Sequence, residues 1–465
     1  MAEPTRVDAV SRRTVLKGLA GAAGLVSVPA IIAACSSPAG SSAPSAAAPS
    51  AAASEAASAA ASAAASVATG SVTFGSNYDN VDTDKKAMQA VVDAFTAKTG
   101  ITVTVNTVAH GPFQDQISSY LQGTPDDVFT WFAGYRMRFF AAQGLATDIS
   151  DLWAKIGSNF SDAFKQASTG DDGKQYFVPF YNYPWVVIYR KSVFADKGYT
   201  VPKTVAEFKA LGDKMKKDNL TPLSFADKDG WPAMGTFDII NMRINGYKYH
   251  VGLMAGTEKW TDPKTAAVFA AWKDLLPYHA DITGALGRTW QDGANALVQK
   301  KAGMYFLGTF AGQQATDPAD HDDLDFFPFP TFGTEFDTEL GIDAPIDGFM
   351  LTAKSPSLAA DLDADKAFLE YLSSGEAQIT FLVANPNSVA AGNDADASGY
   401  SPFQKKSAEI IAGSGAIAQF LDRDTRPDFA GPNGMQGFLQ NWLSKPDQDM
   451  TAFLKSIQDF WDSLA

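Results

Sequence analysis

Residues 71–105 read SVTFGSNYDNVDTDKKAMQAVVDAFTAKTGITVTV, and the fold prediction starts from this stretch. Its first five and last five residues predict strands, and the last five alternate between apolar and polar side chains. Between the strands, apolar side chains recur at the spacing of one helix face, from a cap at Asp82 or Thr83 to a stop at Gly100. The stretch therefore predicts a strand, a helix and a second strand, the repeating unit of α/β domains.

The same alternation continues along the rest of the chain. About 395 residues follow position 70, enough for two or three domains. The fold class is therefore predicted to be α/β with mainly parallel sheets. The further predicted elements are a buried strand at 127–132, a helix opened by the capping box Thr204–Glu207, helices at 262–276 and 292–301, a strand at 304–307 and an amphipathic C-terminal helix.

The N-terminal segment predicts export and lipidation. Arg12 and Arg13 precede a weakly apolar stretch that is too short for a membrane-spanning helix, so residues 1–34 are interpreted as a twin-arginine signal peptide. The stretch ends at Cys35, the only cysteine, which is the expected lipidation site and the anchor to the outer face of the cell membrane. Residues 35–70 are mostly Ser, Ala and Pro and predict a flexible tether.

Composition and motifs narrow the class of function. The net charge is -15, and four basic and two acidic groups lie in residues 1–34, so the rest of the chain carries -17. Such acidity argues against nucleic acid and anionic membrane surfaces as partners. A single cysteine excludes an internal disulfide and a cysteine-based zinc site. No catalytic, phosphate-binding or dinucleotide-binding motif occurs, so neither an enzyme nor a cofactor is expected.

Several short segments occur in an order that is known from one family. They are VTFGS at 72–76, PDDVFTW at 125–131, QGLATDI at 143–149, VPF at 178–180, VIYRK at 187–191, VPKT at 201–204, KAGMY at 301–305 and DGFM at 347–350. This order resembles the extracellular solute-binding proteins of ABC importers, in the sugar-binding branch that includes maltose-binding protein. The resemblance covers essentially all residues from Ser71 onward.

The resemblance implies a two-lobed protein with the ligand in a cleft between the lobes, each lobe being a mainly parallel sheet flanked by helices. It implies a monomer that closes on a sugar, expected to be an oligosaccharide, and hands it to the permease of an ABC importer outside the cytoplasm. The chain would cross between lobes near Asn182, Ile342 and Ser388. The expected lobes are 71–182 plus 343–387 and 183–342 plus 388–465.

The expected binding residues follow from the chemistry of a sugar. Its ring has an apolar face that stacks on aromatic side chains and a rim of hydroxyls that needs polar groups, and sites in open α/β sheets lie beyond the carboxyl ends of strands. For Arg423 in the run Asp422-Arg423-Asp424, a surface ion pair is favoured over a place in the cleft. The resemblance implies further ligand contacts at Trp131, Tyr135 and Arg136, and near Thr309 and Phe310. The other candidate ligand contacts are Asn77, Tyr78, Tyr183, Trp185, Asp227, Trp231, Trp290, Asp347 and Phe349.

Two other functions remain open from the sequence. A polyamine site would place acidic groups beside the aromatic residues, and the loops near the expected cleft are acidic. A secreted glycoside hydrolase would need two cleft carboxylates as an acid and base pair, for which Asp227 and Asp347 are the candidates.

Overall fold

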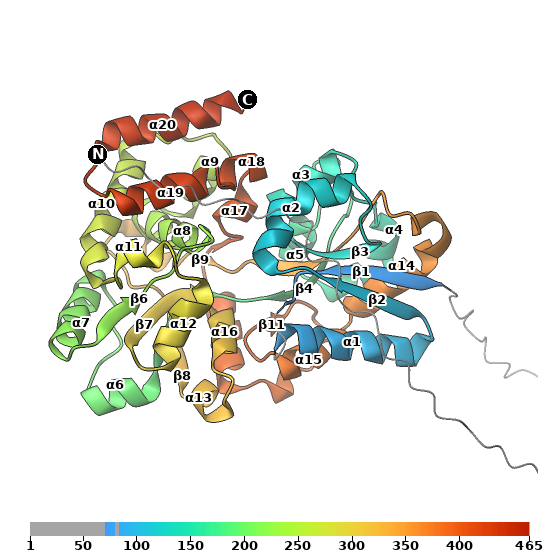
Figure 1. Cartoon of the computed structure of the whole chain (residues 1–465), viewed down its shortest axis with the longest axis horizontal. Helices are drawn as coiled ribbons and strands as arrows, with labels where there is room; N and C mark the ends of the chain where they lie inside the picture. Colours follow the sequence, from blue (N-terminus) through green and yellow to red (C-terminus); the bar gives the residue numbers. More distant parts are fainter. Residues whose placement is uncertain (1–69, 80–82, 465) are drawn as a thin grey trace, which may run out of the picture. The chain divides into compact units, whose positions relative to one another are not determined.

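The structure is a computed structural model that describes residues 70–79 and 83–464. The predicted signal peptide, Cys35 and nearly all of the tether lie outside the described residues. The described residues belong to one compact unit, in which two larger sheets each carry their own helices (Figure 1). We call the parts around these two sheets the first lobe and the second lobe.

The sheet of the first lobe has six strands in the order β11-β4-β10-β3-β1-β2. Strands β1 to β4 run in one direction, and β10 and β11 run the other way. The sheet is therefore mixed: β1–β2 and β1–β3 are parallel neighbours, and the other neighbouring pairs are antiparallel. Its strands are β1 (Ser71–Ser76), β2 (Thr102–Thr107), β3 (Val128–Phe132), β4 (Val178–Asn182), β10 (Ile346–Leu351) and β11 (Val389–Ala390).

The sheet of the second lobe has four strands in the order β6-β7-β5-β8. Here β5 runs against β7 and β8, while β6 and β7 are parallel. These strands are β5 (Trp185–Arg190), β6 (Thr221–Ser224), β7 (Ala302–Gly308) and β8 (Leu324–Phe327).

The chain passes from the first sheet to the second after β4 and returns to it before β10. The first crossing follows β4, which ends at Asn182, and the return passes through β9 (Ile342–Asp343), which pairs with β12 (Ile417–Ala418). The third crossing differs from the expected boundary at 388, because β11 still pairs with β4 in the sheet of the first lobe.

Helices cover both faces of the first sheet and surround the second. In the first lobe, α2 and α3 lie on one side of the sheet and α1 and α15 on the other (Figure 1). The helices of the first lobe are α1 (Asp84–Thr99), α2 (His110–Gln122), α3 (Tyr135–Ala142), α4 (Ser150–Ile156), α5 (Asp162–Ala167), α14 (Leu358–Leu372) and α15 (Gly375–Ala384).

The remaining helices belong to the second lobe or to the segment that follows β11. No helix among the described residues is long and apolar enough to cross a membrane. These helices are α6 (Lys191–Lys197), α7 (Val205–Lys217), α8 (Pro232–Asn245), α9 (Tyr247–Met254), α10 (Pro263–Leu275), α11 (Ile282–Ala285), α12 (Trp290–Val298), α13 (Pro318–Asp322), α16 (Pro402–Gly413), α17 (Leu421–Asp424), α18 (Pro427–Ala430), α19 (Met435–Ser444) and α20 (Met450–Ser463).

Local sequence signals explain where several helices begin and end. The Thr204 hydroxyl accepts the Glu207 backbone N–H at 3.2 Å and the Glu207 carboxylate accepts the Thr204 N–H at 3.3 Å, so the predicted capping box opens α7. Gly100 ends α1 in the left-handed conformation, with φ of 77°. A second capping box at Thr289 starts α12 at Trp290, two residues before the predicted start, and this places Trp290 at the helix terminus.

In the first lobe, successive residues of a strand point to opposite faces of the sheet. The side chains on each face pack into a separate hydrophobic core. Phe74 of β1 contacts Phe368 of α14, with ring centroids 5.6 Å apart. Trp131 of β3 faces the opposite side and contacts Phe113 of α2 at 6.3 Å. Apolar burial on both faces fixes the register of the sheet and so holds the loops at its edge in place.

Candidate functional site

A cavity of about 240 Å³ lies where residues of the two lobes face each other. The residues of the first lobe that line it come from the ends of β1 and β3, from β4 and β10, and from the start of α2. Residues of the second lobe come from β5, from the turns before α8 and α12, from the 3-10 helix Thr309–Gln314 and from α17. Its position beyond strand ends is typical of ligand sites in α/β proteins.

The second lobe contributes an aromatic wall to the cavity. The rings of Trp290 and Phe310 meet edge to face with centroids 5.2 Å apart, and Trp231 lies 5.9 Å from Phe310. All three are partly exposed. Trp185, which is only 2% exposed, supports this wall from behind, with its ring 6.2 Å from that of Trp231. Partly exposed rings on a packed base suit contact with an apolar ligand face.

The first lobe contributes a polar wall. Tyr78, Tyr181 and Asp347 line this wall together, and the Tyr78 and Tyr181 rings have their centroids 6.4 Å apart. Burial raises the pKa of both tyrosines well above the usual range, so their hydroxyls stay protonated. Asn77 is buried beside them, and its backbone N–H donates to the Thr130 hydroxyl at 3.0 Å. The wall thus presents fixed hydroxyl and amide groups.

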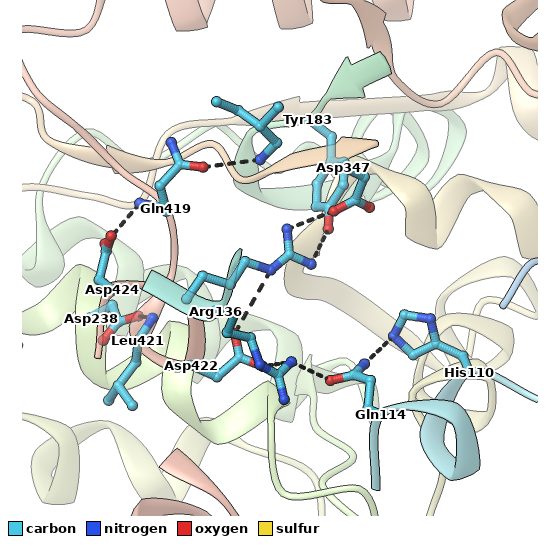
Figure 2. Close-up of polar contacts among 12 residues, drawn as sticks. His110, Gln114, Arg136, Tyr183, Asp238, Asp347, Gln419, Leu421, Asp422 and Asp424 are labelled. Atoms are coloured by element: carbon cyan, nitrogen blue, oxygen red, sulfur yellow. Dashed lines mark hydrogen bonds and ion pairs between the residues drawn. The ribbon is translucent and has the colours of Figure 1, made fainter. Parts of the chain in front are cut away.

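A buried ion pair joins the two lobes at the base of the cavity. Nη1 of Arg423 lies 2.6 Å from Oδ1 of Asp347, and Nη2 of Arg423 donates to the Tyr183 hydroxyl at 3.3 Å (Figure 2). Burial raises the pKa of Asp347, and the nearby Arg423 guanidinium opposes this effect. The guanidinium also lies over the Phe132 ring at 3.9 Å. The expectation of a surface ion pair at Arg423 was therefore wrong.

The position of Arg423 is set by the packing of α17 on the second lobe. The Leu421 backbone N–H donates to the Asp238 carboxylate of α8 at 2.7 Å. The Thr425 hydroxyl donates to the Met254 carbonyl of α9 at 2.8 Å. Since these contacts fix both ends of α17, Asp422 and Arg423 are held against the first lobe.

A second ion pair between the lobes lies beside the first. Nη1 of Arg136 on α3 is 3.2 Å from Oδ2 of Asp422 and also donates to Oε1 of Gln114 at 2.6 Å. Nε2 of Gln114 lies 2.5 Å from Nε2 of His110, which lines the cavity (Figure 2). The cavity floor is therefore one connected polar network.

Most of the candidate ligand contacts meet at this cavity. Trp131 reaches it, but its side chain is 1% exposed and packs among phenylalanines, so its ring face is not available for stacking. The candidates that line the cavity are Asn77, Tyr78, Trp131, Tyr183, Trp185, Trp231, Trp290, Phe310 and Asp347.

Tyr135 and Arg136 do not line the cavity. Tyr135 begins α3, and the guanidinium of Arg138 lies over its ring at 5.8 Å. Arg136 stands behind the cavity wall, where it bonds to Gln114 and Asp422. Arg136 therefore contacts two residues that line the cavity but does not line it itself.

Asp227, Thr309 and Phe349 are fully buried outside the cavity. Asp227 accepts the Ala233 backbone N–H at the start of α8, and Thr309 donates to the Asn387 carbonyl at 2.7 Å. Phe349 lies two residues deeper along β10 than Asp347 and packs on the rings of the core. The structure therefore does not bring Asp227 and Asp347 together as an acid and base pair.

The sequence analysis missed several residues that line the cavity. Asp229 occupies the position that was expected for Asp227, two residues along the same loop. No motif marks the others, since they come from unrelated elements. These others are His110, Gln114, Tyr181, Gln313, Phe420 and Asp422. Within residues 70–79 and 83–464, no group of His, Cys, Asp or Glu side chains is placed to hold a metal ion.

Two sheets with helices on their faces and a lined cleft between them form a two-lobed α/β protein with a ligand-sized cavity. The family described as "Bacterial extracellular solute-binding protein" matches residues 79–379, and the chain belongs to this family.

Two curated relatives show which proteins the chain is similar to. The chain is 27% identical over 303 residues to an ABC transporter extracellular-binding protein of Pyrococcus horikoshii, covering 64% of this chain and 65% of that protein. It is 27% identical over 249 residues to the diacetylchitobiose binding protein DasA of Streptomyces coelicolor, covering 51% and 55%. The matches thus span less than two thirds of these two relatives.

A solved structure matches over nearly its whole length. It is the bacterial solute receptor AcbH, which is described as having an exclusive substrate preference for β-D-galactopyranose. The identity is 47% and the TM-score 0.80, with 85% of this chain and 99% of AcbH covered.

Proposed function

We propose that this chain is a sugar receptor that binds a single pyranose ring between its lobes and delivers it to an ABC importer. The observation that carries the proposal is that the aromatic wall and the polar wall line the same cavity. The partly exposed rings of Trp231, Trp290 and Phe310 face the hydroxyl, amide and carboxylate groups of the first lobe. A pyranose has an apolar face and a polar rim, which match these two walls.

Two observations favour a monosaccharide over the oligosaccharide expected from the sequence. The cavity volume of about 240 Å³ lies below the roughly 300 to 1,000 Å³ that is typical of pockets for drug-sized ligands. AcbH, which is 47% identical to this chain, is described as preferring β-D-galactopyranose. D-Galactose is therefore the first ligand to test.

The Asp347 carboxylate is not free to receive an ammonium group of a polyamine, because it already receives the Arg423 guanidinium at 2.6 Å. Other aspartates, among them Asp79 and Asp229, also line the cavity. A polyamine is therefore tested beside the sugars.

The proposal includes the location and the mode of action. The chain is exported through its twin-arginine signal, is lipidated at Cys35 and acts as a monomer on the outer face of the cell membrane. It works by binding alone, without a cofactor: a ligand that contacts both lobes stabilises the closed form, which the permease subunits of the importer recognise.

Isothermal titration calorimetry on the purified protein tests the ligand class. D-Galactose, D-glucose, lactose, maltotriose and spermidine are titrated in parallel, and a thermal-shift series repeats the panel, because a ligand that binds only the native state raises its melting temperature. We expect saturable binding of one or more of the monosaccharides. Binding of spermidine alone, or of no sugar, would refute the proposed function.

A further inference from the structure

A polar relay leads from α17 of the second lobe to the cavity wall of the first. We call the four side chains Asp422, Arg136, Gln114 and His110 the His110 relay (Figure 2). Arg136 donates to Asp422 at 3.2 Å and to Gln114 at 2.6 Å, and Gln114 meets His110 at 2.5 Å. This arrangement is separate from the aromatic wall and from the ion pair between Arg423 and Asp347.

The relay permits only one assignment of donors and acceptors. A guanidinium has no acceptor atom, so the oxygen of the Gln114 amide must face Arg136. The amide nitrogen of Gln114 therefore faces His110, and this nitrogen can only donate. Nε2 of His110 must accept that hydrogen bond, so the imidazole is neutral and carries its proton on Nδ1.

The surroundings of His110 keep the ring neutral. Burial, together with the charges of Arg423 and Arg136, lowers the pKa of His110 to about 4. The Phe132 ring lies 6.0 Å from the imidazole. No carboxylate hydrogen-bonds to the imidazole within the part of the chain that the structure describes.

Nδ1 of His110 is left over as a donor at the cavity. His110 lines the cavity, and among the described residues its Nδ1 has no hydrogen-bond partner. A half-buried N–H at a ligand site is satisfied when a ligand atom with a lone pair approaches it. Hydroxyl and ring oxygens of a sugar have such lone pairs, and an ammonium group has none.

We propose that His110 donates from Nδ1 to an oxygen of the bound ligand, and that Gln114 and Arg136 are positioning residues that fix this polarity. The inference rests on the proposed function for the identity of the ligand, but the tautomer itself does not depend on it. His110 thus helps the site to select uncharged oxygen acceptors over amines.

Nitrogen NMR on the full chain without ligand tests the tautomer. The imidazole 15N shifts and their couplings to the ring protons distinguish a proton on Nδ1 from one on Nε2, and the His110→Asn variant identifies the His110 signals. We expect Nδ1–H at pH 7. A proton on Nε2, or an imidazolium at pH 7, would overturn the relay whether or not the protein binds sugar.

Two variants on the same helix test the positioning role. Gln114→Leu removes the donor to Nε2, so both tautomers become accessible, and D-galactose binding should weaken roughly tenfold with a change in the His110 shifts. Gln116→Leu is the matched control, because Gln116 is exposed on α2 and does not line the cavity. Unchanged shifts in Gln114→Leu would contradict the inference.

Two substitutions of His110 test which ring nitrogen contacts the ligand. The amide nitrogen of Asn reaches the place of Nδ1, whereas that of Gln reaches the place of Nε2. In calorimetry with D-galactose, His110→Gln should therefore bind roughly tenfold more weakly than His110→Asn. The reverse order, or equal loss, would overturn the contact. If the unaltered protein binds no sugar, the proposed function fails, and the NMR result alone still decides the tautomer.

Discussion

Arg423 and Asp347 form a buried ion pair across the two lobes, with Nη1 and Oδ1 2.6 Å apart and their side chains 7% and 12% exposed. They are separated by 76 positions in the chain, and each lines the cavity. Removal of either partner leaves an unpaired charge that is largely shielded from solvent by the surrounding side chains, and this gives the first prediction.

Arg423→Met and Asp347→Asn should each lower the free energy of unfolding by about 3 to 5 kcal/mol. The double variant should lose less than the sum, because no unpaired charge remains. Urea denaturation of all three proteins measures the coupling. The exposed pair Arg426–Asp428 is the matched control, with an expected coupling below about 1 kcal/mol. Additive losses at Arg423 and Asp347 would contradict the account.

The aromatic wall gives the second prediction. Trp231→Ala and Trp290→Ala should each weaken D-galactose binding by about 1 to 3 kcal/mol, because stacking and apolar burial are lost. Trp131→Ala should instead lower the free energy of unfolding by about 3 to 5 kcal/mol, because it opens a void in the core. Calorimetry and urea denaturation on each variant separate the two effects. Native affinity in Trp231→Ala and in Trp290→Ala would remove the aromatic wall from the site.

The buried Asp227 gives a prediction on pH. Burial raises its pKa to about 8 in the folded protein, against about 3.9 in an unfolded chain. Between these values the folded state binds more protons, so its stability falls as pH rises, by at most about 1.4 kcal/mol per pH unit. Asp227→Asn should lack this contribution. Between pH 4 and pH 8 the parent protein should therefore lose more unfolding free energy than Asp227→Asn does. If the difference between the two proteins stays constant over this range, the assignment is contradicted.

The proposed lipid anchor gives a prediction in cells. Cys35→Ala should be exported but released from the membrane fraction, because the acceptor of the lipid is gone. Ser36→Ala is a neighbouring control that should stay with the membrane. Fractionation and immunoblotting measure both, and retention of Cys35→Ala in the membrane fraction would refute lipidation at this position.

Local signals in the sequence predicted the boundaries of helices better than they predicted contacts between distant side chains. The capping box at Thr204 and the left-handed stop at Gly100 depend on neighbours within a few residues, so α7 and the end of α1 were correctly predicted. Trp231, in the sequence Gly230-Trp231-Pro232, was among the candidate ligand contacts, and the structure brings it to the cavity.

The errors occurred where a side chain depends on distant partners. Arg423 lies beside two aspartates in the sequence, but its partner in the fold is Asp347, from the other lobe. Phe349 belongs to the same strand as Asp347. It lies two residues further along that strand, where its side chain is buried in the core rather than at the edge of the cavity. His110 has no local signature, because its role depends on Gln114 and on a guanidinium from another helix.

Small-angle X-ray scattering with and without saturating D-galactose tests the central claim, that a sugar is bound between two lobes which close on it. The cavity is lined from both lobes, so a ligand that fills it contacts both and shifts the population toward the closed form. We predict that the radius of gyration falls on binding, and that the Trp231→Ala variant needs more sugar for the same change. A constant radius of gyration while calorimetry reports saturation would contradict the account.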